Sequence, residues 1–184
     1  MRLSQSWKPR RKVKPVCCYE FRARQTMSEL THFDDSGASR MVDVGAKDVT
    51  KREALASAQV TMQPSTMKLV RDRQVAKGDV LEVARLAGIM AAKRTWELVP
   101  LCHPLPLDSV EINFEFIDDV KLAIEARTSV TSRTGVEMEA LTAAATAALT
   151  VYDMCKSVDR AIVIERIQLE EKKGGKSGHF VRSH

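Results

Sequence analysis

The residues best suited to chemistry in this sequence include an acid and a base three positions apart. Asp153 and Lys156 meet on one face of a helix if this stretch is helical, as its alanine-rich pattern predicts. A carboxylate beside an ammonium group can set its proton affinity, which suits general acid–base catalysis. The same spacing also describes an ordinary surface ion pair, and spacing alone leaves both interpretations open.

Two further acids, Glu137 and Glu139, lie at the start of the same expected helix. Glu139 shares a face with Asp153, but a rise of 1.5 Å per residue separates the two by about 21 Å. They cannot form one acid–base pair within one chain. If both serve one site, a second copy of the chain must bring them together. Glu137 also fits the N3 position of a T-x-x-E capping box that begins at Thr134.

A proline-rich loop carries the histidine best placed for function. In Pro100-Leu-Cys-His-Pro104, His103 precedes a proline, so its backbone is extended and its ring is held on a stiff loop. A loop histidine that bonds a backbone carbonyl is the structural alternative. Metal binding is disfavoured, because Cys102 and His103 point in different directions and no third ligand is nearby in the sequence.

Lysines and glycines at two places indicate binding of an anion. Lys77 precedes the helix start expected at Asp79, where free backbone N–H groups attract phosphates. Near the C-terminus, the stretch KKGGKSG, which contains Lys172 and Lys176, resembles the end of a P-loop. Glu170 stands where that motif requires a glycine, so the P-loop is excluded. Two interpretations stay open: a flexible cationic segment that can wrap a polyphosphate, or a solvated tail.

The rest of the pattern predicts the elements that position these residues. A D-x-x-E signature starts a helix at Asp79, and Asp118-Asp119 marks a hairpin turn. Helix and strand patterns both fit residues 53–62. We expect strands at 38–45, 110–116, 120–126 and 162–169, and helices at 64–70, 79–98 and from 134 to about 158. This order fits an α+β fold with helices on one face of an antiparallel sheet.

Composition places the chain among ordinary globular domains. It has 184 residues, of which 44% are hydrophobic and 29% charged, and it contains no run of about 18 apolar residues that could span a membrane. The net charge of +5 is unevenly distributed, because residues 1–26 carry +7 and the remainder −2. The nearly neutral charge of residues 27–184 argues against a nucleic-acid-binding domain.

The basic stretch 1–26 is expected to be a disordered extension, or the product of a start codon upstream of a true start at Met27. A transit peptide and a contact with nucleic acid or a membrane are the alternatives. The cysteines at 17, 18, 102 and 155 form neither a CxxC pair nor a zinc pattern. They fit a reducing compartment, so we expect a cytoplasmic protein.

Four long blocks together resemble one protein family. They are LTHFDDSGASRMVDV, KGDVLEVARLAGIMAAKRTWELVPLCHPL, TGVEMEALTAAATAALTVYDMCK and GGKSG. Through them, residues 30–180 resemble the MoaC family, the cyclic pyranopterin monophosphate synthases of molybdenum cofactor biosynthesis. The usual beginning of that family, Met-Ser-x-Leu-Thr-His, matches residues 27–32.

The resemblance implies a ferredoxin-like α+β subunit in a homohexamer, a trimer of dimers with active sites at subunit interfaces. It implies a lyase that converts (8S)-3′,8-cyclo-7,8-dihydroguanosine 5′-triphosphate to cyclic pyranopterin monophosphate and pyrophosphate. No cofactor, metal, nucleic acid or membrane partner is implied. The matching catalytic residues are Lys77, Asp153 and Lys156, and the matching substrate-binding residues are Leu101, Cys102, His103, Met138 and Glu139, with Glu137, Lys172 and Lys176 at pocket positions.

A binding module without catalysis, such as a sensor of a phosphorylated ligand, would keep the same fold. The intact residues Lys77, Asp153 and Lys156 argue against it.

Overall fold

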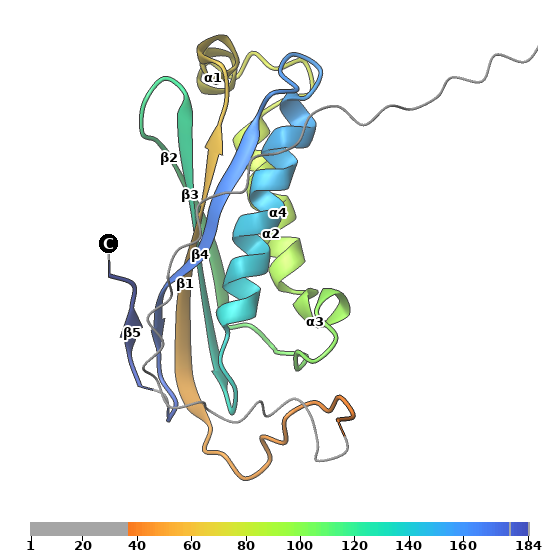
Figure 1. Ribbon diagram of the computed structural model, residues 1–184, viewed down its shortest axis with the longest axis vertical. Coiled ribbons are helices and arrows are strands. Elements are labelled where there is room, and N and C mark those ends of the chain that lie inside the picture. Colours follow the sequence, from red (N-terminus) through yellow and green to blue (C-terminus); the bar gives the residue numbers. More distant parts are fainter. Residues whose placement is uncertain (1–36, 177, 184) are drawn as a thin grey trace, which may run out of the picture. The chain divides into compact units, whose positions relative to one another are not determined.

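The computed structural model describes residues 37–176 and 178–183 (Figure 1). The extension at 1–26, with its two cysteines, lies outside the described residues. The described part contains, in order, β1 (Thr50–Thr61), α1 (Pro64–Arg71), α2 (Val80–Ala92), α3 (Thr95–Leu98), β2 (Ser109–Phe116), β3 (Lys121–Ser132), α4 (Glu137–Cys155), β4 (Val163–Lys173) and β5 (Phe180–Val181).

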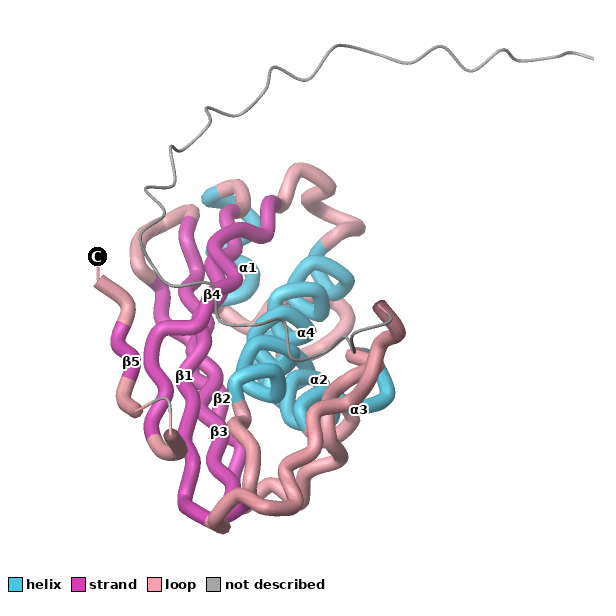
Figure 2. The backbone as a smooth tube through the Cα atoms, turned by 60° about the horizontal axis from the view of Figure 1, so that its bottom comes forward, coloured by secondary structure: helices cyan, strands magenta, loops and turns pink. Residues whose placement is uncertain are grey.

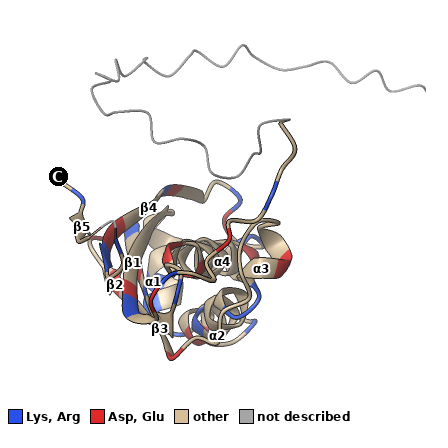
Figure 3. Cartoon of the chain, turned by 90° about the horizontal axis from the view of Figure 1, so that it is seen from below, with Lys and Arg blue, Asp and Glu red and all other residues tan. Residues whose placement is uncertain are grey.

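The strands form one antiparallel sheet in the order β2-β3-β1-β4-β5. Helices α2 and α4 lie side by side on one face of this sheet (Figures 1 and 2). Charged residues lie on the strands of this sheet (Figure 3). On β3, Glu125 and Arg127 are exposed and alternate with buried side chains, so they point away from the helices. The predicted α+β fold, a ferredoxin-like antiparallel sheet with helices on one face, is confirmed.

Alternating burial along β1 resolves the ambiguity at residues 53–62 in favour of a strand. Every second side chain faces the helices, and the central ones are small. Small residues on both sides let α4 pack closely on the sheet, which explains an alanine-rich core. The buried alanines are Ala54, Ala56 and Ala58 on β1, and Ala140, Ala143, Ala144, Ala147 and Ala148 on α4.

One glycine permits the close packing of α2 against α4 and β2. A Cβ atom on Gly88 would lie 2.3 Å from Cδ1 of Ile112 and 2.9 Å from the carbonyl oxygen of Ala143. Ile112 is 1% exposed, and the carbonyl of Ala143 is part of the backbone of α4 and can move only with the helix. Gly88→Ala should therefore lower the free energy of unfolding by roughly 1–3 kcal/mol, although alanine favours helix. Urea unfolding measures this, and an unchanged or higher midpoint would contradict it.

The strand expected at residues 38–45 is wrong. Apart from an isolated bridge at Ser39, the segment is loop and turn, in which the N–H of Gly45 donates to Oδ1 of Asp43 at 2.8 Å. The N–H of Lys47 donates to the carbonyl of Val44 at 3.0 Å. Aspartate and glycine two residues apart favour such a turn over a strand, because the carboxylate satisfies the backbone locally.

The helix expected at 79–98 begins as predicted but is interrupted. Asp79 is its N-cap and accepts hydrogen bonds from the N–H groups of Leu81 and Glu82. The helix ends at Ala92, and α3 follows after a short break. Thr95 causes part of this break, because its hydroxyl donates to the carbonyls at the end of α2.

The expected T-x-x-E capping box at the start of α4 is also wrong. Val136 is the N-cap and makes no side-chain capping bond, and Glu137 is the first helical residue. Instead of capping, the carboxylate of Glu137 pairs with Lys172 on β4. The final strand is longer than expected, since β4 runs to Lys173 and pairs with β5. The helix at 64–70 and the hairpin strands at 110–116 and 120–126 are confirmed.

Candidate active site

The candidate residues form two groups at opposite ends of α4. Lys77, Asp153 and Lys156 form the lysine cluster at its C-terminal end. At its N-terminal end, the loop at residues 101–105 and the first turn of the helix line a cavity of about 430 Å³ that we call the histidine pocket. A second cavity at this end, of about 520 Å³, is the cationic pocket. The 19 residues of α4 keep the groups apart, as the helical rise predicts.

The lysine cluster is centred on Asp153. Nζ of Lys156 lies 2.5 Å from Oδ1 of Asp153, which confirms the contact predicted from their spacing. Nζ of Lys77, from the loop before α2, donates to the backbone carbonyl of Asp153 at 2.9 Å and lies 3.7 Å from its Oδ2. Lys77 therefore satisfies a free carbonyl at the end of α4, where the helix dipole favours a cation.

The hydrogen bond between Lys156 and Asp153 keeps both groups charged. It lowers the pKa of Asp153, with the nearby charges of Lys156 and Lys77 adding to the effect, and it raises the pKa of Lys156. At neutral pH Lys156 is an ammonium ion held by a carboxylate, so it can act as a proton donor. The side chain of Asp153 is 59% exposed, which leaves the cluster open to a ligand or a second chain.

His103 lines the histidine pocket and is fixed by one contact. Its Nε2 lies 2.9 Å from the carbonyl oxygen of Val42. Because a carbonyl only accepts hydrogen bonds, Nε2 of His103 donates its N–H to Val42. The carbonyl-bonded loop histidine considered from the sequence is therefore present. The same residue also lines the histidine pocket.

Glu139 is a buried acid in this pocket. It is 4% exposed, and no ion pair among the described residues involves it. Burial raises its pKa from an ordinary value near 4.5 to about 7, and the charge of Glu137 adds to the rise. Burial also raises the pKa of the neighbouring Cys102 thiol, with a contribution from Glu139. Cys102 therefore stays a neutral thiol, which does not suit a nucleophile.

The raised pKa of Glu139 predicts a stability cost that grows with pH. Between about pH 4.5 and 7, the folded chain holds a proton at Glu139 that the unfolded chain has lost. The free energy of unfolding therefore falls as pH rises through this window. Relative to the unchanged protein, Glu139→Gln should be more stable by roughly 2–3 kcal/mol at pH 8 and little different at pH 4.

Urea unfolding at pH 4, 6 and 8 measures this difference, with Glu97→Gln on α3 as the exposed control. A difference that stays constant with pH would contradict a buried, proton-binding Glu139.

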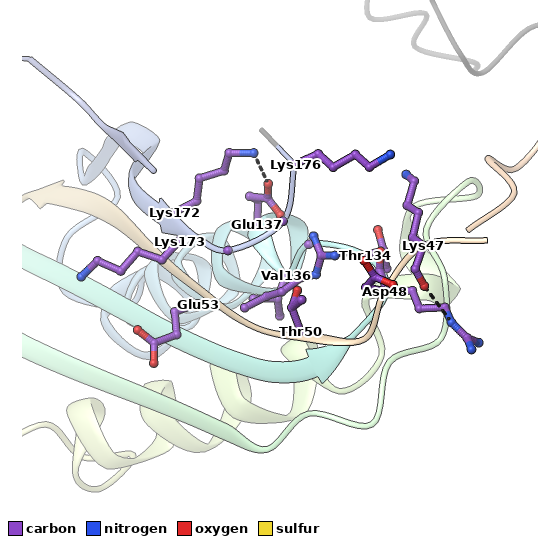
Figure 4. Close-up of a pocket in the computed structure, with 15 residues that line it drawn as sticks. Lys47, Asp48, Thr50, Glu53, Thr134, Val136, Glu137, Lys172, Lys173 and Lys176 are labelled. Carbon is purple, nitrogen blue, oxygen red and sulfur yellow. Dashed lines mark hydrogen bonds and ion pairs between the residues drawn. The ribbon is translucent and has the colours of Figure 1, made fainter. Parts of the chain in front are cut away.

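The cationic pocket is lined by six basic side chains (Figure 4). Arg52, near the start of β1, donates from Nε to the carbonyl of Ser132 and from Nη2 to that of Arg133, each at 3.1 Å. A Cβ atom on Gly175 would lie 2.1 Å from Nη1 of Arg52, and Gly175 has a φ of +77°. Glycine at this position lets the loop lie against the guanidinium. The six are Lys47, Arg52, Arg133, Lys172, Lys173 and Lys176.

The two pockets share part of their walls. Lys47, Thr134, Gly135 and Glu137 line both, so the cavities are neighbours around the start of α4. The structure also brings the expected pocket residues to this end of the molecule. Leu101, Cys102, His103, Met138 and Glu139 line the histidine pocket, Lys172 and Lys176 line the cationic pocket, and Glu137 lines both.

Sequence reasoning did not single out three of the lining cations, Lys47, Arg52 and Arg133. Lys47 follows the segment wrongly expected to be a strand, and its carbonyl accepts from Nε of Arg133 at 3.1 Å. A cation on a strand, such as Arg52, gives no sequence signal of its own. Arg133, just before α4, was a usable signal of an anion site, because helix N-termini and cations both attract anions.

Two further findings concern only the described residues. No group of three or more His, Cys, Asp and Glu side chains is arranged to hold a metal ion. No helix there is long and apolar enough to cross a membrane.

Comparison with known proteins shows a match over most of the chain. The model of the MoaC family matches residues 41–175. The cyclic pyranopterin monophosphate synthase of Thermomicrobium roseum is 61% identical over 157 residues, which is 85% of this chain and 95% of the relative. That of Brevibacillus brevis is 54% identical over 84% of this chain and 96% of the relative. Cyclic pyranopterin monophosphate synthase 3 of Mycobacterium tuberculosis is 58% identical over 83% and 86%.

Proposed function

Because the chain belongs to the MoaC family, we propose that it makes cyclic pyranopterin monophosphate. The substrate would be (8S)-3′,8-cyclo-7,8-dihydroguanosine 5′-triphosphate, and pyrophosphate would be released, which makes the enzyme a lyase of molybdenum cofactor biosynthesis in the cytoplasm. The observation that carries this proposal is the shared wall of the two pockets. One is strongly cationic and the other is lined by acids and a histidine, which suits a ligand with a triphosphate at one end and a guanine-derived ring at the other.

The cationic pocket would hold the triphosphate. Lysine and arginine make charge-assisted hydrogen bonds to phosphate, and arginine can do so with two parallel bonds. Arg52 is anchored through Nε and Nη2, so its Nη1 faces the glycine loop and the cavity. Lys172 and Lys176 would neutralise the charge that develops on the departing pyrophosphate.

The histidine pocket would hold the guanine-derived ring. As a carboxylate, Glu139 can accept two N–H groups from such a ring, and Nδ1 of His103 can accept a third. Leu101 and Met138 supply apolar walls. A ring with several N–H donors would favour the ionised form of Glu139, since hydrogen bonds to a carboxylate lower its pKa.

The lysine cluster would move the protons. Opening an imidazole ring, closing a pyrazine ring and forming a cyclic phosphate each require proton transfers on nitrogen or oxygen. Lys156 begins as an ammonium ion and would donate first, while Asp153 sets its proton affinity. Lys77, bound to the end of α4, would be the partner acid or base.

A second copy of the chain would complete the site, since the pockets and the lysine cluster lie at opposite ends of α4. A two-fold packing of antiparallel helices would place the cluster of one copy at the pockets of the other. The surface of the helix layer supports this arrangement, because both helices expose large apolar side chains. They are Val83, Leu86 and Met90 on α2, and Met138 and Leu149 on α4. Three such dimers would form the hexamer.

Turnover separates this function from that of a binding module with the same fold. The full chain would be mixed with the cyclic dihydro-GTP substrate while pyrophosphate release and product mass are followed together. We expect equal amounts of pyrophosphate and cyclic pyranopterin monophosphate. Tight substrate binding without either product would contradict catalysis and favour the binding module.

A further inference from the structure

One acid lies inside the cationic pocket and pairs with one of its cations. Oε1 of Glu137 lies 3.2 Å from Nζ of Lys172, and both side chains are largely buried, at 28% and 22% exposure (Figure 4). The Glu137 carboxylate also folds over Gly135, where a Cβ atom would lie 1.9 Å from Oε2. The backbone at Gly135 therefore leaves room for this placement of the carboxylate.

We propose that Glu137 is an internal counter-anion, which occupies the anion position at Lys172 until a phosphate group displaces it. The proposal rests on the proposed function only for the identity of the natural ligand. Its physical content is that Lys172 binds either the Glu137 carboxylate or a phosphate oxygen.

The other acids in the pocket do not compete in this way. Six cations and three acids line the cavity. The other two acids are Asp48, which is in no ion pair between described residues, and Glu53, which pairs at 2.8 Å with Lys51, a residue outside the lining. Among the ion pairs between described residues, only Glu137–Lys172 joins two lining side chains. Among the described residues, Glu137 is therefore the acid that a phosphate at Lys172 must displace.

A phosphate is able to win this exchange. It carries more charge than a carboxylate and offers more acceptor oxygens, and Lys172 lies beside further cations that would bind it together. The displaced Glu137 has a place to go, because it also lines the histidine pocket. It remains in the first turn of α4, where the helix dipole favours an acid.

This exchange would make the pocket selective for polyphosphates. Small anions with one charge have too little charge and too few acceptor oxygens to replace the Glu137 carboxylate. The empty site would therefore keep Lys172 in position without binding them. Only a ligand that binds several of the cations at once would gain enough free energy to break the Glu137–Lys172 ion pair.

The test measures binding of inorganic tripolyphosphate by calorimetry at fixed salt concentration. Glu137→Gln keeps the shape and removes the charge, so it should bind tripolyphosphate about three- to tenfold more tightly than the unchanged protein. The matched control is Glu53→Gln, which removes a lining acid whose ion pair is with Lys51, outside the lining, and whose coupling to the lining Lys173 is through charge alone. Its affinity should rise less than that of Glu137→Gln.

A second pair of variants isolates Lys172 as the shared partner. In a Lys172→Met background, Glu137→Gln should bring no further gain, because the cation for which the two anions compete has been removed. Circular dichroism and gel filtration would verify that each variant keeps its fold and assembly.

Three results would overturn the inference. Unchanged or weaker binding by Glu137→Gln would mean that the carboxylate only holds the lysine in place. An equal gain in Glu53→Gln would show a general charge effect. Absence of tripolyphosphate binding by the unchanged protein would remove the anion site itself. None of these results depends on turnover, so a protein that makes cyclic pyranopterin monophosphate could still fail this test.

Discussion

Replacing Asp153 with asparagine is expected to lower turnover by about a hundredfold or more without disturbing the fold. Asparagine fills the same space but cannot hold the Lys156 ammonium ion as a carboxylate does. The pKa of Lys156 would then fall from its raised value, because the hydrogen bond and the opposite charge that raise it are gone. Since the Asp153 side chain is 59% exposed, its loss should change the unfolding midpoint little.

Steady-state kinetics at several pH values would measure this effect. In Asp153→Asn, the loss of activity toward alkaline pH should begin at a lower pH than in the unchanged protein, because Lys156 would lose its proton earlier. Asp119→Asn is the matched control, since Asp119 is also exposed and pairs with a cation, Arg71, at 3.4 Å. If Asp153→Asn turned over substrate as fast as the unchanged protein, Asp153 would have no part in the mechanism.

The sequence predicted those parts of the site that depend on local geometry. The three-residue spacing of Asp153 and Lys156 places them together in any helix, and the structure has them in contact. The N-cap at Asp79 was equally local and is confirmed. The contact between Lys77 and the end of α4 was not predictable in this way, because it depends on how α2 packs against α4.

The two main errors have different causes, one distant in the sequence and one local. The motif from Thr134 to Glu137 matches a capping box, but Glu137 pairs with Lys172, 35 positions along the chain, as β4 runs past the start of α4. Period-two alternation at residues 38–45 predicted a strand, whereas the local hydrogen bond between Gly45 and Asp43 turns the chain. That turn leads into Lys47, which contributes a cation to both pockets.

The division of the candidate site between two ends of α4 was predictable from the helical rise alone. Which pockets lie at each end was not, because Arg52 on β1, Arg133 before α4 and Lys172 on β4 converge only through the sheet. These three residues are too far apart in the sequence for their spacing to reveal a shared pocket.

Complementation between two inactive variants would test whether one active site is built from two chains. Asp153→Asn damages only the lysine cluster, and His103→Ala damages only the histidine pocket. If each site takes its cluster from one copy and its pockets from the other, a mixed dimer holds one site with both lesions and one with neither. Mixing should therefore restore activity that neither variant has alone.

The measurement is turnover by mixed dimers that carry two different affinity tags and are purified through both. With the cyclic dihydro-GTP substrate, they should recover about half the rate of the unchanged protein, because one site of each two-fold pair is intact. Each variant carried separately through the same purification is the control. Mixed dimers that stay as inactive as their parents would contradict the account, since each chain would then hold a complete site of its own.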